Sequence, residues 1–372
     1  MSTQKENKIN LLVWTRSGES LKIINEDLKQ EFKEKYNILN YTRRGDMLLM
    51  NHIHLDDFSK FSRRILIQPM DGTVMHPHII EKINNFHYIV TPSNISKQLL
   101  ENNGVTKPIK VIPNYYDNNL LDEDNGFFSS LFPEKKYTFY TESTAIHRKN
   151  IDRTLRNFLK EFTEEDNVRL VIKLNEVPKN RILHLKKLLK KYPNHPEVII
   201  INKKLPKEYL HSLKKGIDCY ICLSYMEGFC IPLLDAVVLK KDIITLDTKI
   251  SGYGDFINKE NSILLPNREI PISLSPGDSW IYLKESKWEN VDYIEYKKAL
   301  RTVFNGEYTF NKNQDYSQYS QKNVIKQYNE LLDLVSEEVV EREIKVKELA
   351  QRRYDEHFSK FRMNFDLNRR ID

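Results

Sequence analysis

The chain has 372 residues, which at roughly 150 residues per domain predicts two domains with a surplus for a terminal helix or arm. Hydrophobic residues make up 40% of the sequence and charged residues 30%, which excludes a disordered chain and predicts sizeable cores. The 58 Lys and Arg residues exceed the 52 Asp and Glu residues, giving a formal net charge of +6. So mild an excess argues against a dedicated nucleic-acid binder. It suits a phosphate-bearing ligand or an anionic membrane surface.

Neither the start of the chain nor its cysteines point to secretion. The first ten residues are polar, so no signal peptide is expected, and no apolar run is long enough for a membrane-spanning helix. Three cysteines cannot form a disulfide framework, which favours a cytoplasmic protein. Cys219 and Cys222 form a C-x-x-C, but residues 218–225 have the pattern of a buried strand, on which positions three apart face opposite sides. We therefore expect two buried thiols there, and neither a zinc site nor a redox motif.

Short apolar runs alternate with helical patterns, which predicts an α/β fold with largely parallel sheets. In the first half, strands are expected at 11–14, 37–41, 47–50, 65–68, 88–90 and 109–112, and helices at 20–36 and 96–102. A stretch rich in turn-forming residues at 113–133 predicts a linker. In the second half, strands are expected at 137–140, 169–173, 198–201, 219–223 and 243–246, and helices at 151–162, 181–191, 207–214 and 231–239. From residue 291 the pattern is helical.

This order predicts two Rossmann-like domains that hold a ligand in a cleft beyond the carboxyl ends of their strands. The expected boundaries are 1–115 for the first domain, 116–132 for the linker, 133–290 for the second domain, and 291–372 for closing helices with a C-terminal extension.

Residues 224–236 are the most informative segment. A strand leads through a turn at Gly228 into a helix that opens at Ile231 and Pro232, because proline suits a first helical turn. Backbone N–H groups from Gly228 to Ile231 would point toward an anion, as at other helix N-termini. The carboxylates of Glu227 and Asp235 lie on either side of them. The alternative is a helix with acidic residues placed only to complement its dipole.

The same segment resembles the E-x7-E signature of retaining GT-B glycosyltransferases, the glycosyl transferases group 1 or family 4-like enzymes. Asp235 replaces the second glutamate, and Cys230 stands where glycine is most usual. The resemblance continues in order along the chain, over residues 88–97, 104–105, 111–114, 147–150 and 170–173. It implies the GT-B fold, in which two Rossmann-like domains face a cleft and C-terminal helices follow.

The resemblance also implies roles for individual residues. Glu227 would bind the hydroxyls of the donor sugar and Asp235 those of the ribose. The N–H groups of Phe229, Cys230 and Ile231, after the turn at Gly228, would meet the sugar and the diphosphate. Lys149, with Arg148 or Lys173, would neutralise the diphosphate. The family often has a further arginine before this pair, but residues 142–146 hold none, and Lys173 is the candidate for its place.

Two segments of the first domain are also candidates. Gly18 follows the first strand, where the family places a small-residue turn near the donor phosphates, although an ordinary strand-to-helix turn explains it equally well. Residues 68–78 follow another strand, and Asp71 and His76 are candidates for contact with the donor or the acceptor.

The function implied is a retaining, metal-independent glycosyltransferase, with no cofactor besides its nucleotide-diphosphate sugar substrate and with a glycan, glycolipid or protein-linked acceptor. Four alternatives stay open. They are another sugar-nucleotide enzyme (epimerase or hydrolase), a catalytically silent partner, a glycosidase using Glu227 and Asp235 as paired carboxylates, and a metal-dependent enzyme using Asp122 and Asp124. For the tail at 336–372 we expect packing on protein, in a homo-oligomer, with peripheral membrane contact as the alternative.

Overall fold

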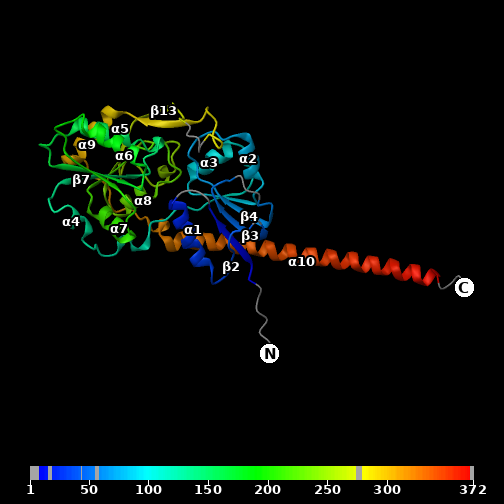
Figure 1. Cartoon of the computed structure of the whole chain (residues 1–372). Coiled ribbons are helices and arrows are strands. Elements are labelled where there is room, and N and C mark those ends of the chain that lie inside the picture. The colour runs from blue at the N-terminus through cyan, green and yellow to red at the C-terminus, as the bar shows by residue number, and fades with distance from the viewer. Residues whose placement is uncertain (1–7, 16–18, 43, 55–57, 274–278, 369–372) are drawn as a thin grey trace. The chain divides into compact units, whose positions relative to one another are not determined.

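The computed structural model describes residues 8–15, 19–42, 44–54, 58–273 and 279–368 (Figure 1). Its contacts divide the chain into two units, residues 1–66 with 325–372, and residues 67–324. The boundaries expected at residues 115, 132 and 290 concern the Rossmann-like domains and remain a prediction. Among the helices described, none has an apolar stretch long enough to cross a membrane.

The first six strands form one sheet, in the order β2-β1-β3-β4-β5-β6. Its elements in chain order are β1 (Asn10–Trp14), α1 (Glu19–Phe32), β2 (Asn37–Ile38), β3 (Arg44–Asn51), β4 (Lys60–Ile67), α2 (Pro77–Asn84), β5 (Tyr88–Thr91), α3 (Asn94–Asn102) and β6 (Ile109–Val111). β1 pairs in parallel with β2 and β3, and β5 with β6. Every strand expected in the first half is present.

The second sheet is parallel throughout and has the order β12-β11-β10-β7-β8-β9. Its elements are β7 (Tyr137–Ser143), η2 (His147–Lys149), α5 (Ile151–Glu161), β8 (Val168–Leu174), α6 (Lys179–Leu189), β9 (Glu197–Asn202), α7 (Lys207–Gly216), β10 (Cys219–Cys222), α8 (Ile231–Val238), β11 (Asp242–Leu246), η3 (Gly252–Asp255) and β12 (Ile263–Leu265). Every strand expected in the second half belongs to it.

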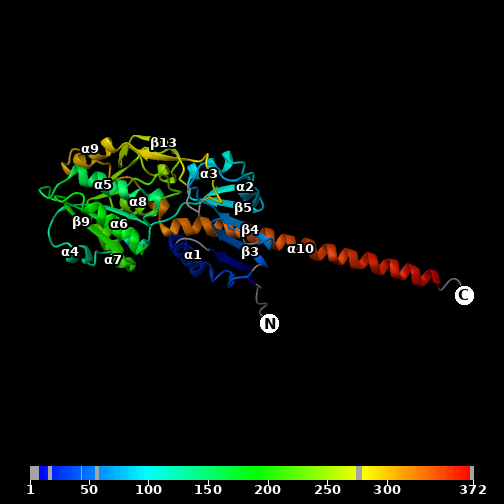
Figure 2. The same cartoon turned by 45° about the horizontal axis from the view of Figure 1, so that its top comes forward.

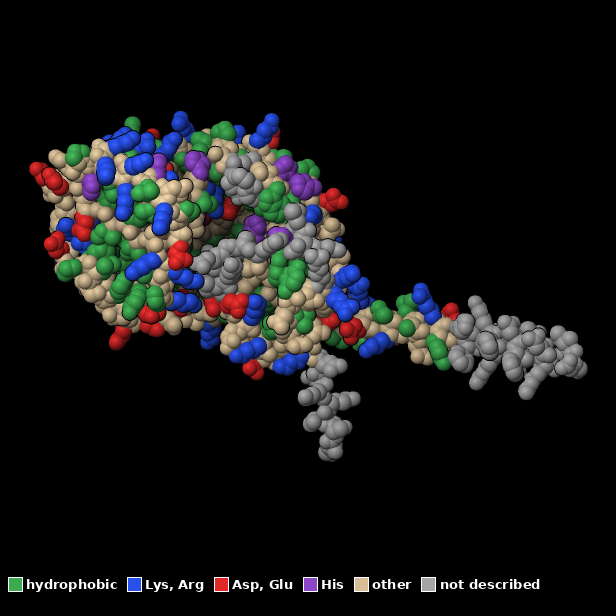
Figure 3. Space-filling view, viewed as in Figure 1, with side chains coloured by type: hydrophobic (Ala, Val, Ile, Leu, Met, Phe, Trp, Pro, Cys, Tyr) green, Lys and Arg blue, Asp and Glu red, His purple; other side chains and the backbone are tan. Residues whose placement is uncertain are grey.

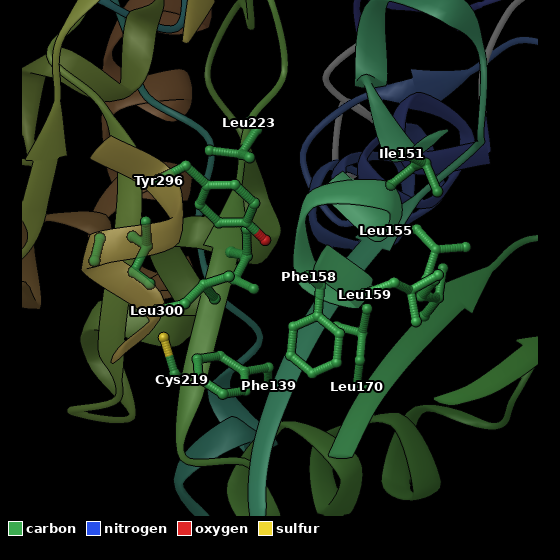
Figure 4. Close-up of a cluster of buried hydrophobic side chains, with 14 of the residues drawn as sticks. Phe139, Ile151, Leu155, Phe158, Leu159, Leu170, Cys219, Leu223, Tyr296 and Leu300 are labelled. Atoms are coloured by element: carbon green, nitrogen blue, oxygen red, sulfur yellow. The ribbon is translucent and has the colours of Figure 1, made fainter. Parts of the chain in front are cut away.

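Helices cover both faces of this sheet (Figure 2), because successive strand residues point to opposite sides. Phe139 of β7 faces one hydrophobic core, to which Phe158 of α5 and Tyr296 also belong (Figure 4). The next residue, Tyr140, faces a second core that includes Leu213 of α7. β10 shows the same alternation, since Cys219 lies in the first core and Cys222 in the second. The expectation of two buried thiols on opposite faces is therefore confirmed.

The stretch expected to be an aperiodic linker contains two short helices, η1 (Asn118–Leu121) and α4 (Phe127–Leu131). α4 lies against α7: the Phe128 N–H donates to Ser212 Oγ at 3.0 Å, and a Cβ at Gly216 would lie 2.0 Å from the Phe128 ring. These helices were not expected, because each is too short to show a helical period. Asp122 and Asp124, between them, are exposed.

After the second sheet come an antiparallel pair of strands, β13 (Asn267–Pro271) and β14 (Lys287–Val291), then α9 (Tyr293–Phe304), η4 (Ser317–Tyr319) and α10 (Gln321–Asn368). The start of α10 packs within the first unit, where Arg63 Nε lies 2.7 Å from Glu338 Oε2 and Arg342 Nη1 donates to Ser62 O at 3.2 Å. Side chains at 340–356 are exposed, so this stretch extends beyond the sheet of its unit (Figures 1 and 3).

Candidate functional site

Polar and charged side chains meet beyond the carboxyl ends of the strands, within the second unit. The contributing segments are the residues after β4, η2 after β7, the turn after β10, and the loop of η3 after β11. Strand ends are where open α/β sheets bind ligands, since several loops converge there.

Glu227 is at the centre of this group and is 5% exposed. Lys149 Nζ donates to both of its carboxylate oxygens, at 2.6 and 2.7 Å. Arg148 Nη1 lies 3.2 Å from Oε2. Burial raises the pKa of this carboxyl, but Lys149 and Arg148 together outweigh it and lower the pKa to about 2. Glu227 is therefore an anion at neutral pH and cannot be a general acid there.

Arg148 joins Glu227 to Asp71. Its Nη2 lies 3.0 Å from Asp71 Oδ2, and its Nη1 also donates to the Met226 carbonyl. Burial opposes its charge, but Asp71 and Glu227 raise the pKa of the guanidinium above its ordinary value. Asp71 is held in turn by Tyr282, whose hydroxyl accepts from the Asp71 N–H at 2.8 Å, and by Trp288, which donates to the Asp71 carbonyl at 2.9 Å. Asp71, a candidate from the sequence, thus belongs to the same network as Glu227.

The turn that carries Glu227 is held by close backbone contacts at two glycines. The Gly252 N–H donates to the Glu227 carbonyl at 2.7 Å, and Ser251 Oγ accepts from the Glu227 N–H at 3.1 Å. A Cβ at Gly252 would lie 2.0 Å from the Gly228 carbonyl oxygen, and one at Gly228 would lie 2.7 Å from Pro69 Cβ. Neither position has room for a side chain, because the Gly228 carbonyl oxygen occupies the space at Gly252 and the Pro69 side chain occupies the space at Gly228.

The turn ends at Cys230, the N-cap of α8, whose φ of 73° and ψ of 74° are unusual for a residue other than glycine. Within the described part of the chain, the N–H groups of Gly228, Phe229 and Cys230 donate to no acceptor. Unpaired donors at the start of a helix, beside Lys149 and Arg148, make an anion-binding environment.

Asp235 lies one turn into α8 and is buried. Its Oδ2 accepts from Lys214 Nζ at 2.7 Å, and the same ammonium group lies 3.2 Å from Glu142 Oε2. Burial raises the pKa of Asp235 above its ordinary value despite Lys214, whereas Asp235 and Glu142 overcome burial and raise the pKa of Lys214. The sequence predicted neither Lys214 nor Glu142 as a site residue. Lys214 belongs to one of several Lys-Lys pairs in the chain and Glu142 is a single acidic residue, so neither stands in a recognisable motif.

The other sequence candidates have different surroundings. Lys173 is 1% exposed and donates to Leu174 O at 3.0 Å and Asn175 Oδ1 at 2.6 Å. His76 is the N-cap of α2, with its Nε2 3.1 Å from Ser279 O. These contacts are not with Glu227 or its cations, and the roles expected for Lys173 and His76 remain predictions. Gly18 lies outside the described residues.

One group in the described chain has the residue types of a metal site. Ligand atoms of Cys222, Glu227 and Cys230 lie within 4.8 Å of one another. Both Glu227 oxygens already accept from Lys149, so a divalent cation would have to displace an ammonium group and tolerate Arg148 beside it. A separate cavity of about 260 Å³ follows β11, lined by Asp247, Thr248 and Asn258 among others, and none of the Glu227 network lines it.

Comparisons with known proteins concern the family of part of the chain and its fold. Residues 122–270 match the model of the family "Glycosyl transferases group 1". No curated protein sequence matches the chain. Among solved structures, HepE of Anabaena in complex with UDP-glucose is 11% identical with a TM-score of 0.62, over 87% of this chain and 99% of that one.

The chain has the GT-B fold. A glycosyltransferase from Rickettsia africae is 12% identical with a TM-score of 0.60, over 88% of this chain and 99% of that one. Sucrose-phosphate synthase of Thermosynechococcus elongatus is also 12% identical with a TM-score of 0.60, over 86% and 80% of the two chains. The fold class expected from the sequence, two Rossmann-like domains with C-terminal helices, is confirmed.

Proposed function

We infer that the protein is a glycosyltransferase that moves a sugar from a nucleotide-diphosphate donor to a glycan, glycolipid or protein-linked acceptor, with retention and without a metal ion. One observation carries this inference. Two cations, Arg148 and Lys149, lie within hydrogen-bonding distance of the Glu227 carboxylate, and the N–H groups of the turn that follows Glu227 donate to no acceptor among the described residues. The family match covers the same residues.

This arrangement suits a diphosphate leaving group. Negative charge grows on the phosphate as the glycosidic bond breaks, so fixed N–H donors and cations stabilise the transition state more than the ground state. Lys149 Nζ donates to the Glu227 carboxylate at 2.6 Å in this structure. In our proposal, some of the N–H donors of Lys149 bind the diphosphate of the donor. Glu227 then accepts hydrogen bonds from hydroxyls of the donor sugar.

Glu227 fits a positioning role better than a proton-transfer role. Its pKa of about 2 keeps it ionised, whereas a general acid needs a pKa near the working pH. A retaining transferase has no need of a protein base if the departing phosphate oxygen takes the acceptor's proton on the same face. The same low pKa rules out Glu227 as the general acid of a paired-carboxylate glycosidase.

Asp235 is proposed to bind the ribose hydroxyls of the donor, with Lys214 keeping its carboxylate oriented. The buried ammonium group of Lys214 donates to Oδ2 of Asp235. The Asp235 carboxylate lies one turn into α8, and the N–H groups proposed to bind the diphosphate lie at the start of the same helix. This spacing suits a ribose that is joined to the diphosphate.

The test uses nucleotide sugars, starting with UDP-glucose. We expect thermal stabilisation and slow donor hydrolysis, both retained in EDTA and both reduced in Glu227→Gln. Asp124→Asn, in the exposed loop, is the matched control and should behave as the unaltered protein. Activity lost in EDTA and restored by Mn²⁺ would refute metal independence and favour the Asp122 and Asp124 alternative.

The second candidate function is a catalytically silent partner of another glycosyltransferase. It is favoured by Cys230 and Asp235, which depart from the family signature at the turn itself. A silent partner would bind the nucleotide diphosphate tightly and turn over no donor with any acceptor. Measurable hydrolysis of any nucleotide sugar, abolished by Glu227→Gln, excludes it.

We also propose a binding partner for the exposed part of α10. The exposed stretch of α10 at 340–356 carries acidic, basic and apolar side chains together (Figure 3), which suits a second protein surface, and we take a second copy of the chain as the partner. A cytoplasmic location and peripheral membrane contact remain predictions from the sequence.

A further inference from the structure

The turn that carries Glu227 begins and ends with a cysteine. Cys222 is the last residue of β10 and Cys230 is the N-cap of α8, and their Sγ atoms lie 3.8 Å apart. Cys222 is 4% exposed, while Cys230 is half-buried against the same hydrophobic core. Both are thiols in this structure. The two sulfur atoms are therefore in contact, with one side of the pair reachable from solvent.

The position of Cys230 also calls for an explanation. A φ of 73° is strained for any residue with a Cβ, and such strain persists only where surrounding contacts fix the conformation. The contact with Cys222 Sγ is one that directs the Cys230 side chain inward. Cys219, on the opposite face of β10, lies in the other core and cannot join the pair.

The pair is chemically asymmetric. The hydrogen bond from the Cys230 thiol lowers the pKa of Cys222, against burial, and Lys149 acts in the same direction. The pKa of the Cys230 thiol is raised by the same hydrogen bond and by burial. Since the thiolate is the reactive species, these shifts favour Cys222 as the nucleophile and Cys230, the more exposed of the two, as the thiol that follows it.

We propose that Cys222 and Cys230 are a site of reversible oxidation, and that their disulfide weakens anion binding by the turn between them. The oxidant is hydrogen peroxide. The Cys222 sulfur attacks one peroxide oxygen, an S–O bond forms, the O–O bond breaks, and the hydroxide released leaves as water with the proton from Cys222. The Cys230 sulfur then attacks the Cys222 sulfur, an S–S bond forms, the S–O bond breaks, and the second water carries away the Cys230 proton. Two thiols and one peroxide thus give one disulfide and two waters.

The effect on the turn follows from geometry. A disulfide brings its sulfur atoms to about 2.05 Å, nearer than the 3.8 Å of the thiols. Cys230 is the N-cap of α8, so in our proposal formation of the disulfide shifts this residue and the N–H groups of Phe229 and Cys230. Because Gly252 and Pro69 leave no space around Gly228, the movement has to be taken up where the anion would bind. This inference goes beyond the proposed function, since oxidation can be measured without any substrate.

The experiment uses the full chain, reduced and then treated with a small excess of hydrogen peroxide in EDTA. Denatured protein is alkylated and digested with trypsin, which releases residues 216–240 as one peptide containing the three cysteines. We expect the oxidised peptide to be lighter by two hydrogen atoms, with alkylation at Cys219 alone, and a dithiol reductant should restore all three thiols. Protein alkylated at all three cysteines after peroxide would overturn the proposal, as would a disulfide that includes Cys219.

Matched variants separate the steps. Cys219→Ala should still form the disulfide. Cys230→Ala should stop at a sulfenic acid on Cys222 that dimedone traps, and Cys222→Ala should react much more slowly. A faster reaction of Cys222→Ala than of Cys230→Ala would contradict the order of attack given above.

Binding of UDP supplies the last measurement. The oxidised protein should bind UDP about tenfold more weakly than the reduced protein, and Cys230→Ala should show no loss upon peroxide treatment. Equal UDP affinity of the reduced and the oxidised protein would refute the proposal that the disulfide weakens anion binding by the turn. If the reduced protein binds no UDP at all, the proposed function fails, while the thiol measurements still decide the oxidation site.

Discussion

At the scale of single residues, the charges around Glu227 indicate different roles for Arg148 and Lys149, which the sequence motif does not distinguish. Glu227 and Asp71 share Arg148, while Lys149 contacts Glu227 from the more exposed side. A buried carboxylate without a partner is costly. Arg148 contacts two carboxylates and Lys149 only one, so we expect the loss of each cation to have a different effect. Arg148 holds two loops together, whereas Lys149 can change partner at lower cost.

Arg148→Ala and Lys149→Ala should therefore differ in kind. Arg148→Ala leaves two carboxylates without their shared partner and should destabilise the fold by about 3 kcal/mol, the range for a broken buried pair. Lys149→Ala removes the main partner of the Glu227 carboxylate and should also lower the melting temperature, but by less than Arg148→Ala because Arg148 still pairs with Glu227, and it should weaken UDP binding about tenfold. Thermal melts with and without UDP measure both effects. Equal stability losses in the two variants would show that Lys149 is equally structural.

The pH dependence of stability should report Glu227. Its pKa is about 2 in the folded protein and 4.5 as its ordinary value, so its ion pairs stabilise the fold fully above pH 4.5. That contribution is lost as the pH falls toward 2, and its full size is about 3 kcal/mol. Between pH 7 and pH 4, denaturant titrations should show the unaltered protein losing about 1 kcal/mol more than Glu227→Gln. If both proteins lose the same stability between pH 7 and pH 4, the pKa of Glu227 is not lowered to this extent.

The sequence predicted these residues only in part, because a sequence pattern reports local chemistry. Glu227, Lys149 and the turn at Gly228 belong to short motifs and could be found. The bridge from Arg148 to Asp71 joins residues 77 positions apart, and Lys214 reaches Asp235 from 21 positions away. Which loops meet at the end of a sheet depends on strand order, and strand order does not appear in periodicity.

At the scale of elements, buried parallel strands were the easiest to predict, since both faces need apolar residues. β10 and β11 lie within one residue of their expected starts. β13 and β14 were missed because their sequences are largely polar, with Trp288 the only strongly buried aromatic signal. α2 was missed: it begins at Pro77, at the end of residues 68–78, for which only contacts with the donor or the acceptor were expected.

The contact between two glycine-containing loops predicts a specific defect. Gly252→Ala would place a Cβ against the Gly228 carbonyl, which must displace the turn carrying Glu227. Overpacking of this kind costs about 1–3 kcal/mol, and UDP binding should fall together with stability. Gly306→Ala is unsuitable as a control because its φ is positive, so Ser317→Ala, on the exposed surface, serves instead. Normal UDP affinity in Gly252→Ala would show that the turn adapts without loss of its geometry.

At the scale of the whole molecule, the long helix α10 has two parts with different environments. Its residues up to Val339 bury apolar side chains, among them Tyr328, Leu332 and Val335. Between Arg342 and Glu356 the apolar residues are exposed, including Ile344, Val346 and Leu349. The sequence predicted the helical period of both parts, but not the point at which packing within the chain stops.

This division makes the oligomer proposal testable with a sharper truncation. Removing residues 345–372 keeps the contacts of Glu338 and Arg342 with the first unit and deletes only the stretch whose apolar residues lie beyond them. Sedimentation should show a lower mass for the truncated protein, while its UDP-binding affinity and its binding to anionic liposomes stay unchanged. A membrane would be held weakly, because each basic residue adds only about 1 kcal/mol near an anionic surface and acidic residues are interspersed along the stretch. Liposome binding that disappears upon truncation, with an unchanged sedimentation mass, would instead identify the extension of α10 as a membrane-contacting helix.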